Sequence, residues 1–297
     1  MAQPKVSVLM VTYNRPQMIG RAVASVCEQS LGDWELLIIQ DGSNPDTERL
    51  LEEWLARDQR IRYLPRGTVG SIAEASNFGL AAARGDYIAI LDDDDYWIDR
   101  LKLERQVEFL EENPGYVGCG GGYVVLDQYD RQRGKFLKPQ DDAAIRARAL
   151  LANPIANSTA MFRRVLEGVP LVYDVSMRQF ADWDFWLTMG TRGKLYNFPF
   201  HLAHYTLWEG GSSFQRQREN GRAAMRIIRK HRRAYGGFAP AVLLAWLYCV
   251  YAHLPGGLRR ASYASLSALK KALAGGAVGK LWPIRSPRPI IGRKGDR

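Results

Sequence analysis

The sequence predicts an α/β protein built on a mostly parallel sheet with flanking helices. Short apolar runs alternate with segments whose apolar residues recur at helical spacing, an order typical of βαβ units. Three of the apolar runs end in polar clusters, at Thr12–Asn14, Asp41–Ser43 and Asp92–Asp95. Because ligands bind off the carboxyl ends of the strands in such sheets, the three clusters predict one shared site.

The first half of the chain supplies the regular alternation. Apolar runs bounded by turn residues predict strands, and apolar residues three or four positions apart predict helices. The expected strands are Val6–Val11, Trp34–Ile39, Ile61–Leu64 and Tyr87–Leu91. The expected helices are Met18–Gln29, Thr47–Arg57, Gly70–Ala83 and Leu101–Glu112.

The second half is less regular. Glycine-rich Val117–Leu126 and the run Ile155–Phe162 predict strands, residues 127–142 predict a polar loop, and Trp183–Gly190 predicts a short helix. Further helices are expected over Gly221–Tyr235, which is basic, and over the strongly apolar Ala241–Leu254. Residues 283–297 contain several Pro, Arg and Lys residues and predict a flexible tail.

Composition bounds the class of protein. The chain has 297 residues, of which 46% are hydrophobic and 24% charged, a balance typical of globular proteins. Its three cysteines, Cys27, Cys119 and Cys249, are far apart and indicate neither a disulfide framework nor a zinc site. No signal peptide is visible, so we expect a cytoplasmic protein.

Positive charge is concentrated in the last quarter of the chain. Residues 215–297 hold 18 Lys and Arg but only two acidic residues, Glu219 and Asp296. The apolar run 241–254 is shorter than the ~20 residues of a membrane-spanning helix. Basic residues flank it, so it is typical of an interfacial helix on the inner, anionic face of a membrane. The alternative is a helix packed on the rest of the protein or in a dimer interface.

The run Asp92–Asp95 is the most informative motif. Packed carboxylates repel one another and raise each other's pKa values, which is costly unless a cation lies among them. Mg²⁺ and Mn²⁺ prefer oxygen ligands and commonly share them with phosphates, so a divalent metal is the expected partner. The alternative is a solvated acidic turn that caps a helix starting near Tyr96.

Four stretches together resemble the family-2 glycosyltransferases, which have a GT-A-type fold. They are Val6–Pro16, Glu35–Ser43, Asn77–Asp95 and Asp182–Leu187, in the order and spacing of the family. The resemblance covers roughly residues 4–215. It implies transfer of a sugar from a nucleotide donor, mostly with inversion at the anomeric carbon.

The resemblance also implies roles for single residues on the donor side. Thr12, Tyr13 and Arg15 match positions that line the nucleotide pocket, where an aromatic ring can stack on a base. Asp41 matches the carboxylate that accepts a hydrogen bond from the base; a turn residue is its alternative reading. Asn77 lies in the matching stretch as a further nucleotide-binding candidate, although it could equally cap a local turn.

The aspartate run and one later aspartate match the family's reaction centre. Asp94 would hold the metal, and Asp92 would contact the ribose or a metal-bound water. Asp93 and Asp95 are secondary candidates, Asp93 on the nucleotide side. Asp182 matches the general base that takes the proton from the acceptor hydroxyl.

The base has two alternative readings. Asp184, two residues further along, would point elsewhere on a helix and is the backup base. Asp182 itself could instead be an ordinary helix N-cap.

The chain departs from the family pattern at several positions. Ala181 stands where a glutamate usually precedes the base, and Ser76 stands where many members have arginine. Thr206 and Trp208 occupy positions where an arginine and a histidine are common. His201 or His204 could compensate for the missing histidine, and Arg216, Arg218 and Arg222 could clamp a diphosphate or simply form a basic helix face.

We therefore expect an inverting, metal-dependent glycosyltransferase. Residues 1–215 would form the catalytic domain, with 1–115 as nucleotide-binding half and 116–215 as acceptor-binding half, and residues 216–282 would form a helical extension. The donor would be a nucleotide-sugar, UDP-linked by preference, and the acceptor a glycan or lipid-linked hydroxyl. The alternatives are a nucleotidyltransferase, which the absence of glycine from Thr12–Pro16 disfavours, and a non-catalytic module that binds membrane or nucleic acid; no nucleic-acid partner is expected.

Overall fold

A computed structural model describes residues 3–207 and 217–255, together with the single residues Leu258, Ser262, Leu266 and Leu269. Several expectations lie outside these residues. They concern Trp208, Arg216, the side chain of Arg218 and the tail 283–297.

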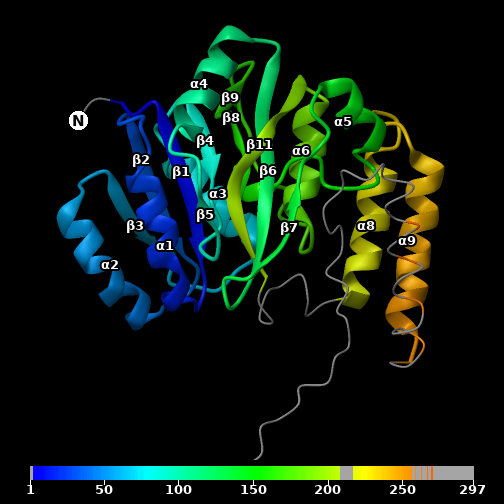
Figure 1. Ribbon diagram of the computed structural model, residues 1–297, viewed down its shortest axis with the longest axis horizontal. Coiled ribbons are helices and arrows are strands. Elements are labelled where there is room, and N and C mark those ends of the chain that lie inside the picture. Colours follow the sequence, from blue (N-terminus) through cyan, green and yellow to red (C-terminus); the bar gives the residue numbers. More distant parts are fainter. Residues whose placement is uncertain are drawn as a thin grey trace, which may run out of the picture.

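A mixed sheet runs through the middle of the molecule, with helices on both of its faces (Figure 1). Within the described residues its strands are β1 (Val6–Thr12), β2 (Trp34–Gln40), β3 (Ile61–Pro65), β4 (Tyr87–Ile90), β5 (Tyr96–Trp97), β6 (Tyr116–Asp127), β7 (Gln132–Phe136), β8 (Met161–Arg163) and β11 (Lys194–Leu207). Their order is β3-β2-β1-β4-β8-β6-β11-β5, and β7 pairs with β6. Two short strands, β9 (Val165–Leu166) and β10 (Val169–Pro170), form a separate hairpin.

The parallel pairing expected from the sequence is present in the first four strands. β3, β2, β1 and β4 are all parallel neighbours, with Val6 opposite both Trp34 and Tyr87. Beyond β4 the sheet becomes mixed, because β8 is antiparallel to both β4 and β6 while β6 and β11 run parallel. The carboxyl ends of β1, β2 and β4 therefore meet at one edge, as the polar clusters predict.

Side chains cap the start of some of the described helices. These helices are α1 (Pro16–Cys27), α2 (Pro45–Arg57), α3 (Ile72–Ala82), α4 (Lys102–Glu112), α5 (Asp142–Arg148), α6 (Ala181–Gly190), α8 (Gln217–His231) and α9 (Phe238–His253), with a short 3₁₀ helix η1 (Asn157–Thr159). Asn44 caps α2 with its side-chain oxygen, and Ser71 and Glu74 form a reciprocal capping box at the start of α3.

Alternating strand residues supply two apolar cores, one on each face of the sheet. Leu36 and Ile38 of β2 belong to the core that includes residues of α1, α2 and α4, whereas Leu37 and Ile39 belong to the core that includes residues of α3, α6, α8 and α9. This period of two is the reason why the strands read as nearly continuous apolar runs: a strand covered on both faces must be apolar on both.

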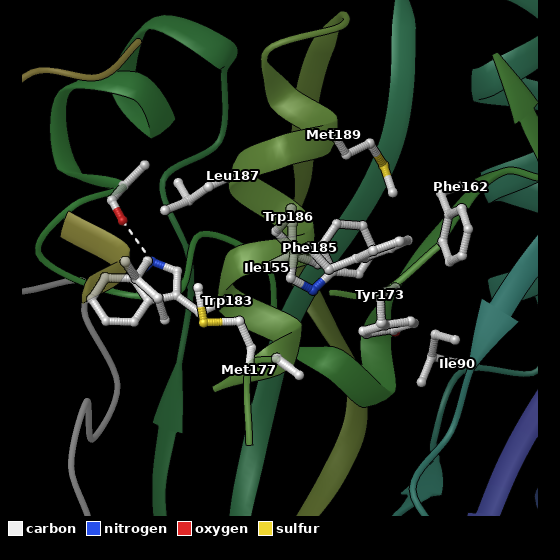
Figure 2. Close-up of a cluster of buried hydrophobic side chains, with 14 of the residues drawn as sticks. Ile90, Ile155, Phe162, Tyr173, Met177, Trp183, Phe185, Trp186, Leu187 and Met189 are labelled. Carbon is white, nitrogen blue, oxygen red and sulfur yellow. Dashed lines mark hydrogen bonds between the residues drawn. The ribbon is translucent and has the colours of Figure 1, made fainter. Parts of the chain in front are cut away.

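The helix α6 is embedded in the second core. Figure 2 shows Trp183, Phe185 and Trp186 projecting from it among buried side chains of other elements. The Trp183 indole N–H donates to the backbone oxygen of Ala149 at 2.8 Å, and the Phe185 ring stacks on Tyr173 with centroids 4.1 Å apart. Close packing and a satisfied indole fix the position of α6, which carries Asp182.

Four local expectations differ from the structure. No helix starts near Tyr96, which lies in β5; α4 begins only at Lys102. The polar loop 127–142 contains β7, whose exposed residues pair with β6 and so carry no apolar signature. The middle of the expected strand Ile155–Phe162 is η1, because Asn157 and Ser158 favour a turn, and only its last two residues lie in a strand, β8. The sequence reading also missed β11, the longest strand described.

The helices α8 and α9 pack side by side at one end of the molecule (Figure 1). Ala224 and Ile227 of α8 and Leu244 and Tyr248 of α9 belong to the same core as α6. The opposite side of α9 stays exposed and apolar, with Trp246 at 56% exposure. In the parts of the chain that the structure describes, no helix has the length and apolarity needed to cross a bilayer.

Candidate active site

Three carboxylates of the aspartate run converge just beyond β4. Asp92, Asp94 and Asp95 each offer an oxygen, and these atoms all lie within 4.8 Å of one another. Asn157 donates to Asp92 Oδ1 at 2.9 Å, while the Thr206 backbone N–H donates to Asp95 Oδ1 at 2.9 Å. The cluster is therefore held from three directions, by β4, η1 and β11.

Burial makes this cluster costly to ionise. It raises the pKa of Asp92 to about 7, with repulsion from Asp94 and Asp182 adding to the effect. It also raises the pKa of Asp93 to about 7, although the Arg15 guanidinium opposes the change, and it raises the pKa of Asp95 well above its usual range. Removal from water disfavours the charged carboxylate, and repulsion between neighbours acts in the same direction.

Arg15 is the cation that neutralises part of the cluster. It follows β1 and reaches across to the end of β4, where Nη1 lies 2.6 Å from Asp94 Oδ2 and Nη2 lies 2.8 Å from Asp93 Oδ1. The guanidinium thus bridges two carboxylates, of which only Asp94 belongs to the convergent group. Asp93 is fully buried under this bridge, whereas Asp92 and Asp94 remain partly accessible.

The donor set of the cluster suits a divalent cation. It consists of carboxylate oxygens alone, which are hard ligands of the kind that Mg²⁺ and Mn²⁺ prefer. Two of the three residues, Asp92 and Asp94, are partly accessible, so a solvated ion bound to phosphate could reach them. Asp95 joins this group, while Asp93 turns away to Arg15.

The ends of β1 and β2 form the neighbouring part of the site. Thr12 is buried, and the Tyr13 ring is 45% exposed. Beside it Gly42 has φ of +84°, and a Cβ there would come within 2.8 Å of Val69. Glycine is needed for this turn on both counts, and a Cβ at Gly42 would also contact the Tyr13 ring at 3.8 Å.

Asp41 already has donors in this structure. The Arg66 guanidinium lies 2.7 Å from Asp41 Oδ1, and the Gly70 N–H donates to both carboxylate oxygens at 3.1 Å. The carboxylate is thereby fixed at the carboxyl end of β2, next to Tyr13. Arg66 had no role in the sequence-based expectation.

Asn77 bonds the backbone of Tyr173. Its Nδ2 donates to the Tyr173 backbone oxygen at 2.9 Å, and its Oδ1 accepts from the Tyr173 N–H at 2.7 Å. Both ends of the amide are engaged, so Asn77 joins α3 to the segment that precedes α6.

Asp182 lies in the first turn of α6, close enough to Asp92 to raise its pKa. The N-cap of α6 is Phe180, in a left-handed conformation and without a side-chain cap bond, so Asp182 is not the N-cap residue. Asn153 Nδ2 donates to Asp182 Oδ2 at 2.6 Å, and Lys138 donates to the Asn153 backbone oxygen at 2.8 Å. Burial raises the pKa of Asp182, and burial lowers the pKa of Lys138 to about 8.

Asp184 points away from the cluster and ties α6 to α8. Its carboxylate accepts from Lys230 Nζ at 2.7 Å and contacts His231 Nε2 at 2.8 Å. The side chain is 2% exposed. This environment gives Asp184 a structural role, which leaves Asp182 as the carboxylate that faces the acidic cluster.

The two histidines considered as substitutes for the missing family histidine do not join the cluster. His204 Nδ1 bonds the Tyr96 hydroxyl, and the two rings lie edge to face with centroids 4.7 Å apart. His201 lies beyond it on β11, where burial lowers its pKa. Neither belongs to the group of convergent ligand atoms found among the described residues.

A family model decides the identity of the chain. The model described as glycosyl transferase family 2 matches residues 7–168, which include the ends of β1, β2 and β4. The chain belongs to this family. EpsE of Bacillus subtilis (strain 168), named as a glycosyltransferase, is 32% identical over 220 residues, which cover 72% of this chain and 76% of EpsE.

Solved structures agree with a GT-A fold. Residues 1–349 of TarS from S. aureus, in complex with UDP-GlcNAc, align with a TM-score of 0.63 at 15% identity, covering 91% of this chain and 81% of that one. The mannosyltransferase PcManGT from Pyrobaculum calidifontis, in complex with GDP-Man and Mn²⁺, aligns at 0.59 and 17% identity, covering 94% and 77%. At these identities the likeness establishes the fold alone.

Several residues that shape the site were not found from the sequence. They are Arg66, Lys138, Asn153, Asn157, Ser158 and the Thr206 backbone. The stretch that holds Asn153, Asn157 and Ser158 carried one usable signal, because Asn and Ser favour turns over strands. The others come to the site only through the fold, at separations of up to 111 residues from their partners.

Proposed function

We propose that this family-2 glycosyltransferase is an inverting, metal-dependent enzyme that uses a nucleotide-sugar, UDP-linked by preference. One observation carries the proposal. The oxygens of Asp92, Asp94 and Asp95 converge beside β4, and the carboxylate of Asp182 is near enough to raise the pKa of Asp92. A metal–diphosphate centre and a general base on adjacent elements are the parts that such a transfer requires.

Donor binding would involve the ends of β1 and β2. The exposed Tyr13 ring offers a face for the base, and Asp41, held by Arg66 and Gly70, offers an acceptor for an imide N–H such as that of uracil. Thr12 and Arg15 would lie beside the phosphates, and the Arg15 fork suits phosphate oxygens. Asn77 would act from α3 by positioning the Tyr173 segment.

The metal would be held chiefly by Asp94, with Asp92 and Asp95 beside it. Such a divalent ion, Mn²⁺ or Mg²⁺, stabilises the charge that builds on a departing nucleoside diphosphate. Asp93 would keep its place under Arg15 on the nucleotide side of the cluster.

Asp182 would act as the base. Asn153 fixes one of its oxygens, and burial raises its pKa, so the carboxylate is a stronger proton acceptor than an exposed aspartate. Attack by the deprotonating acceptor oxygen on the face opposite the leaving group inverts the anomeric carbon. Asp184 is excluded from this role by its contacts with Lys230 and His231.

The acceptor would be a hydroxyl of a glycan or of a lipid-linked precursor at a membrane surface. The exposed side of α9 presents Leu243, Trp246 and Val250, and α8 presents Arg222 and Arg229. Apolar and aromatic residues next to cations suit the interface of an anionic leaflet.

UDP binding measured by calorimetry tests the donor and metal proposal. Wild-type protein should bind UDP at least tenfold more tightly with Mn²⁺ than with EDTA, because the ion shields the cluster from the diphosphate. Asp94→Ala should remove this difference and abolish transfer without unfolding the protein. Asp86→Ala is the matched control, because Asp86 is an exposed aspartate at the other end of β4. UDP affinity that is equal in Mn²⁺ and EDTA would contradict the proposal.

A further inference from the structure

The side chain of Arg15 occupies part of the space that the proposed metal needs. Its Nη1 lies 2.6 Å from Asp94 Oδ2, and Asp94 is the residue expected to hold the ion. A guanidinium and a divalent ion at one carboxylate repel each other, because both are cations. A divalent ion and Arg15 therefore compete for Asp94 in the absence of other anions.

Arg15 also bonds a second carboxylate that the metal does not need. Nη2 lies 2.8 Å from Asp93, which is fully buried and outside the group of convergent oxygens. A guanidinium can therefore release Asp94 while Asp93 still anchors its other nitrogen. The freed nitrogen then needs a new acceptor, and a diphosphate oxygen has the charge and geometry that a guanidinium fork prefers.

We propose that Arg15 is a place-holding cation that leaves Asp94 for the donor diphosphate when the metal and the nucleotide-sugar bind together. This inference rests on the proposed function, and it adds a coupling between the two ligands. The metal alone must displace Arg15 without giving it a new partner, whereas the metal with a diphosphate provides one. Each ligand then strengthens the binding of the other by the same factor.

If Arg15 moves from Asp94 to the diphosphate, removing its charge should raise the affinity for the metal. Arg15→Gln removes the competitor, so Mn²⁺ alone should bind roughly tenfold more tightly, a factor that corresponds to about 1.4 kcal/mol. The mutual strengthening between Mn²⁺ and UDP should fall by a similar factor. Loss of Mn²⁺ from the free-ion electron paramagnetic resonance signal measures binding without any need for turnover. Arg21→Gln, which removes an exposed arginine of α1 paired with Asp130, should leave Mn²⁺ affinity unchanged.

A measurement on unmutated protein covers the case in which the variant does not fold. In ¹⁵N-arginine-labelled protein the Arg15 Nε–H resonance, identified by its loss in Arg15→Lys, should shift with Mg²⁺ and UDP together and little with Mg²⁺ alone. An unshifted resonance at saturation, or Mn²⁺ affinity in Arg15→Gln no higher than in wild type, overturns the exchange. Failure of the wild-type protein to bind Mn²⁺ and UDP together would instead overturn the proposed function.

Discussion

Single residues in the aspartate run have different environments although they are neighbours in sequence. Asp92 and Asp94 are partly accessible, whereas Asp93 is buried against Arg15 and Asp95 accepts from the Thr206 backbone. Asp92, Asp94 and Asp95 therefore form the group suited to a cation, with Asp95 also bonded to β11, whereas Asp93 is bonded to Arg15. Burial is the largest cause of the raised pKa values of Asp92, Asp93 and Asp95.

A substitution at Asp182 distinguishes a role as general base from a purely structural role. Asp182→Asn keeps the shape and the Asn153 neighbour but cannot take a proton, so turnover should fall roughly 100-fold or more while UDP affinity stays near wild type. Because burial raises the pKa of Asp182, the wild-type kcat/KM should rise with pH as this carboxyl ionises, above the range of an ordinary aspartate. The variant should lack that rise.

The matched control for this variant is Asp141→Asn. Asp141 is a true helix N-cap, at α5, whose side chain accepts from the Ala144 N–H. It should change stability slightly and leave turnover alone. Full turnover in Asp182→Asn would mean that Asp182 is only a first-turn residue of α6.

At the scale of elements, α8 acts as a support for the site. Asp184 of α6 and Asp174, in the segment before α6, both contact Lys230 of α8. The same helix buries Ala224 and Ile227 in the core around α6. The basic helix is thus joined to α6, which carries Asp182, while Arg222, Arg226 and Arg229 are exposed.

The helix α9 gives a prediction for membrane attachment. Protein should float with vesicles of anionic lipid and remain in the soluble fraction with neutral ones, because α9 combines exposed apolar residues with nearby arginines. Trp246→Glu should reduce the bound fraction roughly tenfold, since it removes the largest exposed apolar side chain of α9. Tyr129→Glu changes a more exposed aromatic residue, in the turn before β7, and this variant should float normally. Wild-type protein that remains in the soluble fraction in the presence of anionic vesicles would contradict the proposed membrane attachment.

At the scale of the whole molecule, the acidic cluster should link stability to pH and metal. Asp92 and Asp93 have pKa values of about 7 in the folded protein, above the ordinary value of 3.8. The folded state therefore keeps protons that the unfolded chain releases, so these groups lower the free energy of unfolding as pH rises from about 4 to about 7. A metal ion that binds the ionised carboxylates should raise the free energy of unfolding again.

Chemical denaturation at pH 5 and pH 7.5, with EDTA or with Mn²⁺, measures this linkage. The increase in the free energy of unfolding on replacing EDTA with Mn²⁺ should be larger at pH 7.5 than at pH 5. Carboxylates with lowered pKa values, such as Asp174 at about 2, complete most of their titration below pH 5 and contribute little to the difference. In EDTA, Asp93→Asn should reduce the fall in the free energy of unfolding between pH 5 and pH 7.5. If Mn²⁺ stabilised the protein equally at both pH values, the linkage to the acidic cluster would be contradicted.

The sequence by itself determined the parallel half of the sheet and the edge at which the site lies. Strand and helix periods are local patterns, and β1, β2 and β4 each carry both an apolar run and a polar end, so their meeting point follows from the topology of βαβ units. The residues Asp41, Asp92 and Asp182 could be named because the family resemblance includes them.

Only the tertiary structure decided which neighbours complete these residues. Asn157 reaches Asp92, the Thr206 backbone reaches Asp95 and Asn153 reaches Asp182 across separations of 29 to 111 residues. Mixed pairing beyond β4 also depends on long-range contacts, and β7 forms from exposed residues without an apolar pattern. Local sequence fixes the conformation of a segment, whereas the partner of a side chain depends on where distant segments pack.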